Sequence, residues 1–304
     1  MVLSSLFPVF GLILLGNLLK RFKLTDESFL KTSDRLVYFV LFPVLLFWKI
    51  GGAQTDSSVN WDLCLCALLA IAAIYLISAV GIKVSKVSNY KAGSFSQSCY
   101  RFNTFIGMAI VFYALGDDGV KHFGILIGCV IPFINVLAVS TLIWHSGGHY
   151  SFWERSQLAT KAIISNPLII ACIAGIVYSR SMNGFPTAIE NGFSLSASVA
   201  LPLALISVGG ALTFKSFKGN FRLSLVASIL KLLFLPIIGY AFLKAFNVTG
   251  IHFDVGIIFF ALPTSAAIYV LSSQLHSDTE LASASIVLST ILSFFSLSVG
   301  LLFL

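Results

Sequence analysis

The sequence predicts an all-α integral membrane protein whose ten transmembrane helices form two five-helix inverted repeats. Three observations predict this class: an apolar composition, ten apolar segments joined by short polar connections, and a constant sequence offset that relates the two halves. Of the 304 residues, 58% are hydrophobic and 10% are charged, and the mean hydropathy is +0.96. Soluble chains carry about 25% charged residues, so this chain has too few charged residues to cover the surface of a soluble protein.

Ten segments are long and apolar enough to cross a bilayer, which requires about 20 largely apolar residues. They cover residues 2–19, 30–50, 61–82, 93–115, 123–144, 160–180, 187–213, 222–245, 254–275 and 281–304. The first segment lacks the basic start and the small-residue cleavage site of a signal peptide, so we expect it to be a membrane helix. The connections are too short to form a soluble domain.

Basic residues predict the orientation of the chain. The loops after the first, third, fifth and seventh segments hold twelve of the 19 Lys and Arg residues, whereas the opposite side holds four. Positively charged loops stay in the cytoplasm, so we expect both termini to lie outside it. The loop after the ninth segment, HSDTE, has no basic residue and does not support either orientation.

An internal repeat relates the two halves of the chain. A shift of 159 or 160 residues pairs Pro8 with Pro167, Gly16 with Gly175, Pro43 with Pro202 and Asn103–Thr104 with Pro263–Thr264, and it brings the Gly51–Gly52 pair near Gly209–Gly210. Each half holds five segments, an odd number, so the second half enters the membrane from the opposite side. We therefore expect a first repeat over residues 1–144, a cytoplasmic connecting loop over 145–159, and an inverted second repeat over 160–304.

The fourth and ninth segments are predicted to be broken helices. Pro263 in the ninth segment removes a backbone donor and clashes with the preceding turn. Arg101 and Asn103 in the fourth segment are costly within a bilayer unless something compensates for them. In inverted-repeat transporters, broken helices expose backbone groups near the membrane midplane, so we expect these two to cross there.

The candidate substrate-binding residues lie at these two breaks. They are Arg101, Asn103, Thr104, Pro263, Thr264 and Ser265. The guanidinium of Arg101 fits a carboxylate with two hydrogen bonds; alternatively, it satisfies backbone carbonyls of the broken helix. The polar side chains either contact substrate or cap the helix ends. Lys231, within the eighth segment, either reaches an interface, pairs across the bundle with an acid such as Asp62 or Glu190, or contacts substrate directly.

Other functional classes find little support in the sequence. It has no HExxH, GxSxG or GxxxxGK[ST] motif, so we expect neither an enzyme nor an ATP-driven pump. The five cysteines lie in apolar segments and indicate core positions, without a disulfide framework or a metal site. The five histidines are expected in loops. The net charge of +7 follows the membrane loops, so we expect no nucleic-acid partner and no cofactor.

Five motifs resemble the auxin efflux carrier family in its short bacterial form. They are FPVFGLILLGNLLKRFKL, LVYFVLFPVLLF, NPLIIACIAGIVYS, LPLALISVGGAL and ALPTSAAIYVLSSQL, in the family's order along the chain. The resemblance implies a fold related to that of the bile acid–sodium symporters, a crossover of helices 4 and 9, and two domains that move against each other. It also implies that Asn103 and Pro263 are the crossover residues. Organic anions such as indole-3-acetate, malate or malonate are the implied substrates.

The sequence therefore predicts a secondary transporter of small organic anions that works by alternating access. Because the cell interior is negative, export of one negative charge is favourable by about 2.3 kcal/mol per 100 mV. We therefore expect electrogenic efflux. The alternatives are a proton- or sodium-coupled carboxylate symporter and a transporter-derived membrane sensor. We expect a bacterial inner-membrane location, with the lipid bilayer and the anion as partners; a homodimer is left open.

Overall fold

Helices make up all the regular structure of the described residues. The computed structural model describes residues 2–52, 59–145, 153–154, 157, 160, 164–182, 184–212 and 219–304. Six helices in these ranges are long and apolar enough to cross a membrane. The predicted all-α class is therefore confirmed.

The elements follow the apolar segments of the sequence. The first half contains α1 (Val2–Arg21), α2 (Glu27–Leu36), the π-helical stretch η1 (Val37–Leu41), α3 (Phe42–Gly51), α4 (Trp61–Val84), α5 (Asn89–Tyr100) and α6 (Thr104–His145). The second half contains α8 (Pro167–Ser181), α9 (Thr187–Ala211), α10 (Phe221–Ile229), the π-helical stretch η3 (Leu230–Phe234), α11 (Leu235–Ala245), α12 (Gly250–Ala261), α13 (Ala267–Gln274) and α14 (Thr279–Leu301).

Local signals explain where several helices begin. The side chains of Asp26, Asn60, Asn166 and Asp278 accept hydrogen bonds from backbone N–H groups in the first turns of α2, α4, α8 and α14. Such caps satisfy N–H groups that have no partner within the helix. Each of these four helices therefore starts directly after a short polar side chain that caps it.

Prolines explain the two π-helical stretches. Pro43 follows η1 by two residues and Pro236 follows η3 by two residues. Because proline offers no N–H and crowds the preceding turn, the ordinary i to i−4 bond cannot form there. A single π-helical turn absorbs this defect without ending the helix. The continuous runs α2–η1–α3 and α10–η3–α11 result.

A glycine divides α6 into two helices. Gly116 has φ of 67° and ψ of −156° in the middle of the element. A positive φ is costly for residues that carry a Cβ atom and open to glycine. The turn lies between the predicted fourth and fifth segments.

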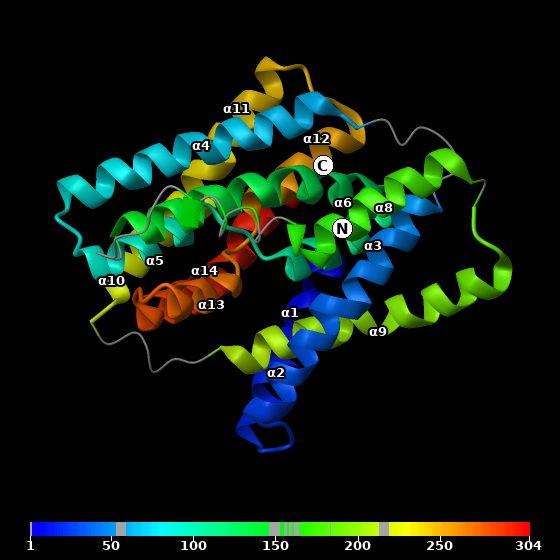
Figure 1. Cartoon of the computed structure of the whole chain (residues 1–304), viewed down its shortest axis with the longest axis horizontal. Helices are drawn as coiled ribbons and strands as arrows, with labels where there is room; N and C mark the ends of the chain where they lie inside the picture. Colours follow the sequence, from blue (N-terminus) through cyan, green and yellow to red (C-terminus); the bar gives the residue numbers. More distant parts are fainter. Residues whose placement is uncertain are drawn as a thin grey trace.

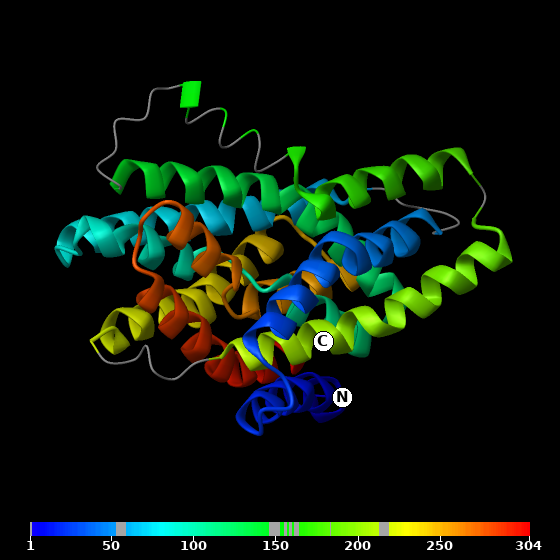
Figure 2. The ribbon, with the colours of Figure 1, turned by 60° about the horizontal axis from the view of Figure 1, so that its bottom comes forward.

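The helices form two groups (Figures 1 and 2). The first group consists of α1, α2, η1, α3, α8 and α9, whereas α4, α5 and the helices from α10 to α14 form the second. The long element α6 packs against members of both groups. An ion pair of 2.7 Å between Lys49 of α3 and Asp117 of α6 joins the first group to α6.

Glycines allow helices of the first group to approach closely. A Cβ atom added at Gly16 of α1 would collide with the backbone of Ile206, and one added at Gly209 of α9 would collide with the backbone of Ile13. The crossing of α8 and α3 is similar, because a Cβ atom on Gly175 would lie 3.0 Å from Cβ of Ile50 and 3.4 Å from the nitrogen of Gly51. Small residues permit such backbone contact between membrane helices.

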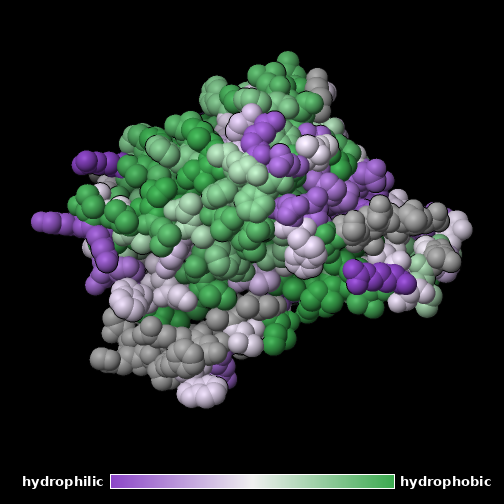
Figure 3. Space-filling model, turned by 90° about the horizontal axis from the view of Figure 1, so that it is seen from above, coloured by the Kyte–Doolittle hydropathy of each residue, from purple (hydrophilic) through white to green (hydrophobic). Residues whose placement is uncertain are grey.

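Large apolar side chains are exposed along the outside of the bundle. Phe7 is 75% exposed and Leu195 is 73% exposed. Figure 3 shows apolar residues covering much of one face. Contiguous apolar surface of this extent is rare on soluble monomers and suits contact with lipid.

Candidate functional site

The chain is non-helical between α5 and α6. Arg101, the C-cap of α5, has extended backbone angles of φ −65° and ψ 154°. The side-chain oxygen of Asn103 then accepts hydrogen bonds from the N–H groups of Phe105 and Ile106, at 3.0 and 3.1 Å. Asn103 therefore caps the start of α6, as the capping alternative for this residue predicts.

A second non-helical stretch separates α12 from α13. It begins at Leu262, which is extended with ψ of 147°, and includes Pro263. The N–H of Thr264 donates to Oγ of Ser289 on α14 at 3.2 Å. The Oγ atom of Ser265 accepts from the N–H of Ala267 at 3.2 Å, at the start of α13.

The two breaks are in direct contact. The backbone N–H of Asn103 donates to the carbonyl oxygen of Pro263 at 2.9 Å. Four helix ends therefore meet in one region: the carboxyl ends of α5 and α12 and the amino ends of α6 and α13. Helix ends carry backbone groups without intrahelical partners, so both hydrogen-bond donors and acceptors are available here.

Arg101 is buried at this meeting point, with only 8% of its surface exposed. Its Nη2 donates to Oδ1 of Asn135 at 3.2 Å, and its Nη1 donates to Oε1 of Gln97 at 3.5 Å. Both acceptors are neutral, and the part of the chain that the structure describes holds no ion pair to Arg101. A buried charge is strongly unfavourable unless it is paired, so an anionic ligand would stabilise this site.

Unused hydrogen-bonding capacity also gathers at the breaks. Nε of Arg101 and Oγ1 of Thr264 are buried and have no hydrogen-bond partner within the described residues. A buried polar atom without a partner costs roughly 1–3 kcal/mol. These two atoms are therefore candidates for contact with a polar ligand.

The structure brings all six predicted site residues to the two breaks. Asn103 and Ser265 act as caps, Pro263 accepts through its carbonyl, and Thr104 begins α6. Sequence reasoning missed Gln97, Asn135 and Ser289. Asn135 is a single polar residue in the apolar run FINVLAV, and a polar residue in such a position indicates a functional site. Ser289 is one of many serines in α14, so the sequence does not distinguish it from the others.

Within the described residues, Lys231 lacks the acid partners that the sequence suggested. Its side chain is fully buried in η3, so it does not reach an interface. Its Nζ donates to the carbonyl of Phe260, in the last turn of α12, at 3.5 Å. Among the described residues, neither Asp62 nor Glu190 forms an ion pair with it.

The expectation that every histidine lies in a loop is wrong. His122 lies in α6 and His252 lies in α12, with their ring centroids 4.3 Å apart. The two come from segments distant in sequence, so no local pattern reveals the pair. The residues for which coordinates are described contain no group of three or more side chains able to hold a metal ion; His149 lies outside those residues.

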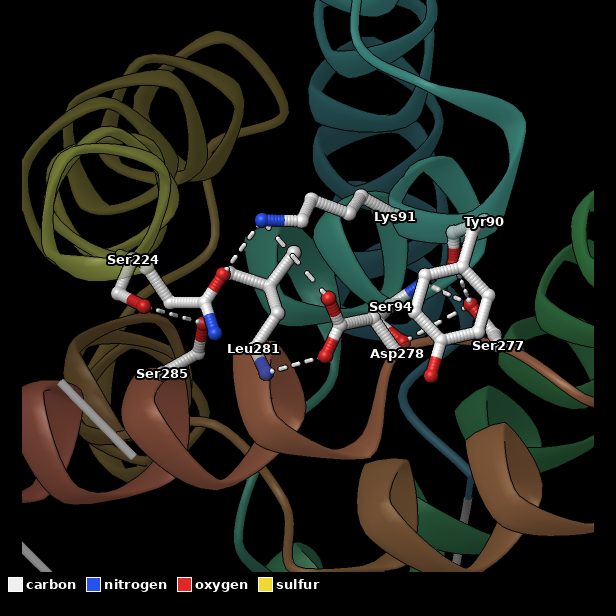
Figure 4. A network of polar contacts seen from close by, with 9 residues as sticks. Tyr90, Lys91, Ser94, Ser224, Ser277, Asp278, Leu281 and Ser285 are labelled. Carbon is white, nitrogen blue, oxygen red and sulfur yellow. Dashed lines mark hydrogen bonds and ion pairs between the residues drawn. The ribbon is translucent and has the colours of Figure 1, made fainter. Parts of the chain in front are cut away.

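A polar network fixes the start of α5 relative to α14 (Figure 4). Nζ of Lys91 donates to Oδ1 of Asn220 at 2.7 Å and lies 3.9 Å from Oδ2 of Asp278. Oγ of Ser277 donates to the carbonyl of Tyr90 at 2.8 Å and lies 2.9 Å from Oγ of Ser94. The network joins three connections at one end of the helices and holds the half-helix that carries Arg101.

Comparison with known proteins assigns the chain to a family. The chain matches the family described as "Membrane transport protein" over residues 1–301. It belongs to this family. The match confirms the resemblance predicted from the motifs, and with the apolar helices it identifies an integral membrane transporter.

Named relatives of the family span nearly the whole chain. An "Uncharacterized transporter" of Methanothermobacter thermautotrophicus is 25% identical over 301 residues, which cover 97% of this chain and 95% of the relative. A "Putative malonate transporter" of Rhizobium meliloti is 22% identical over 311 residues, which cover 100% and 95%. An "Uncharacterized transporter" of Methanocaldococcus jannaschii is 22% identical over 289 residues, which cover 93% and 92%. These names point to transport and away from enzymatic catalysis.

Proposed function

We propose that this family member moves small carboxylates across the membrane by alternating access. The observation that carries the proposal is the buried Arg101, which lies at the meeting point of two broken helices and has only neutral partners among the described residues. A carboxylate would supply the missing negative charge and accept two parallel hydrogen bonds from the guanidinium. Arg101, Asn103, Thr104, Pro263, Thr264 and Ser265 are the proposed binding residues.

The proposed architecture is a ten-helix inverted repeat over residues 1–144 and 160–304, with 145–159 as the connecting loop. Two pairs of glycine contacts support it. Gly16 packs on α9 beside Gly209, and Gly175 packs on α3 beside Gly51. The sequence offset of 159 or 160 residues pairs Gly16 with Gly175 and relates the glycines of α3 to those of α9, so equivalent segments make equivalent contacts.

The proposed topology places both termini outside the cytoplasm of a bacterial inner membrane. Lys91 contacts Asn220 and Asp278, so the connection HSDTE lies beside two basic loops assigned to the cytoplasm. Lys49 and Asp117, assigned to the outside, pair with each other. These contacts support alternating sides for successive loops, while the absolute direction rests on the positive charges.

Two helix groups joined through α6 support a mechanism in which one group moves against the other. The breaks lie in the second group together with α6, while Phe42 of α3 contacts Phe105 of α6 with ring centroids 4.6 Å apart. We propose that movement of this boundary exposes the site to each side in turn. Secondary transporters with repeat architectures move in this way around a fixed site.

Malonate-like dicarboxylates are the first substrates to test, because one relative is named for malonate. The leading mode is electrogenic efflux. Export of one negative charge is favourable by about 2.3 kcal/mol per 100 mV. At about 1.4 kcal/mol per tenfold change, this energy supports a concentration gradient of the anion of roughly 40-fold.

Flux of labelled malonate in liposomes that contain the purified protein tests the proposal. We expect protein-dependent flux that increases with an imposed potential and is inhibited by unlabelled malonate. The neutral analogue malonamide should not inhibit, because it lacks the charge that Arg101 requires. Flux that ignores potential and follows a pH or sodium gradient would replace electrogenic efflux with coupled symport. A screen of small mono- and dicarboxylates without any protein-dependent flux would overturn the function itself.

A further inference from the structure

Lys231 is a fully buried cation that the proposed site does not use. It lies in η3, which packs against α4, α5, α12 and α14. Its Nζ contacts the carbonyl of Phe260 at 3.5 Å. Burial of an ammonium group is costly, so a side chain kept at this depth requires a compensating interaction.

The position of Nζ supplies that interaction. Phe260 lies in the last turn of α12, directly before the break that begins at Leu262. The last four carbonyl groups of a helix have no intrahelical donors, and the helix dipole makes this end negative. In transporters with broken helices, such carbonyl ends coordinate the coupling cation.

Each broken helix has a buried basic side chain at its carboxyl end, although the two make different contacts. Arg101 follows the carboxyl end of α5 directly, and its guanidinium donates to the side chains of Gln97 and Asn135. Lys231 reaches the carboxyl end of α12 from a neighbouring element. Each carboxyl end at the crossing therefore has one buried cationic side chain.

Three acidic residues belong to elements that pack around Lys231. Asp62, Asp254 and Glu280 lie in or near the first turns of α4, α12 and α14 and are exposed or half-buried. The described residues contain no ion pair between Lys231 and any of them. The helix end is therefore the electrostatic partner that remains.

We propose that the ammonium of Lys231 is a tethered cation, bound where a free coupling cation would otherwise sit, so that carboxylate transport is independent of sodium. This inference rests on the proposed function. The charge is covalently attached and moves with η3 and α12, so no cation need be taken from solution in each cycle. The lysine also adds positive potential at the crossing, which favours an anionic substrate.

The first test compares malonate flux by the unaltered protein in sodium, potassium and N-methylglucamine media. We expect rates within about twofold of one another. A requirement for sodium would overturn the inference without affecting the proposed function. Absence of flux in all three media would instead count against the proposed function.

Substitutions of Lys231 provide the second test. Lys231→Met keeps most of the side-chain volume without the charge, and we expect at least a tenfold loss of flux. Lys231→Ala opens space beside the carbonyl of Phe260, and we expect methylammonium or sodium to restore part of its flux. Lys244→Met removes an exposed lysine from α11 and serves as the control, with unchanged flux. Wild-type flux in Lys231→Met would overturn the inference.

Thermal unfolding in detergent gives a readout that does not depend on transport. Methylammonium or sodium should raise the melting temperature of Lys231→Ala and leave that of the unaltered protein unchanged. If no cation stabilises Lys231→Ala or restores its flux, the site does not bind cations and the inference fails. If Lys231→Ala does not fold, two other results test the inference. Lys231→Met should lose flux, and methylammonium in the growth medium should allow Lys231→Ala to fold.

Discussion

The backbone N–H of Asn103 donates a hydrogen bond of 2.9 Å to the carbonyl of Pro263. Both residues lie where a helix is interrupted, and the repeat offset pairs them with each other. Because proline has no N–H, the chain around Pro263 has an excess of acceptors, and the free N–H at the other break supplies a donor. The contact joins the two broken helices at the proposed carboxylate site.

Arg101→Ala should weaken malonate binding at least tenfold in purified protein. A hydrogen bond to a charged group contributes roughly 1.5–3 kcal/mol. Arg101→Lys should recover only part of the affinity, because an ammonium group keeps the charge without the two-pronged geometry. Calorimetry or a thermal-shift titration measures the change. Arg180→Ala, at the exposed end of α8, is the control and should bind normally. Near-normal malonate affinity in stable Arg101→Ala would exclude Arg101 from the site.

Substitutions of Asn103 should separate its capping role from its place in the site. Asn103→Ala removes the cap and should lower the free energy of unfolding by about 0.5–2 kcal/mol. Asn103→Asp keeps a good cap, but it adds a negative charge two residues from Arg101. We therefore expect near-normal thermal stability and weaker malonate binding for Asn103→Asp. Equal loss of stability in both variants would show that the side chain does more than cap α6.

Gly16→Ala should destabilise the first helix group. The added methyl group would collide with the backbone of Ile206, and overpacking costs typically 1–3 kcal/mol. Gly11→Ala is a matched control in the same helix, because a Cβ atom there has no neighbour within 4 Å. Melting temperatures in one detergent compare the two. A Gly16→Ala variant as stable as Gly11→Ala would mean that α1 and α9 are farther apart than described.

Single cysteines in a cysteine-free background should report the topology. Asp118→Cys, in the turn within α6, should react with an impermeant thiol reagent in intact cells. Ser85→Cys, after α4, should react only after the membrane is opened. Both positions are exposed, so accessibility to the reagent depends on the side of the membrane. Reaction of both in intact cells would contradict the inverted-repeat topology.

The chain's amino-acid order determined where the helices lie and where two of them break. Each apolar segment partitions into a bilayer by its own composition, and Pro263 and the Arg101–Asn103 stretch disturb helices locally. Those signals need no knowledge of neighbouring segments. The repeat offset also related Asn103 to Pro263, because it compares residues along the chain.

Only the tertiary structure decided which side chains meet. The partners of Arg101 come from α5 and α6, Lys231 meets the end of α12, and His122 meets His252. These contacts depend on crossing angles and rotations of helices that are far apart in sequence. In the same way, close approach at Gly16 and Gly209 sets the crossing of α1 and α9, and the π-helical turn η3 carries Lys231 on its buried side. Hydrophobicity determines that a segment enters the membrane, but packing between helices determines which of its faces looks inward.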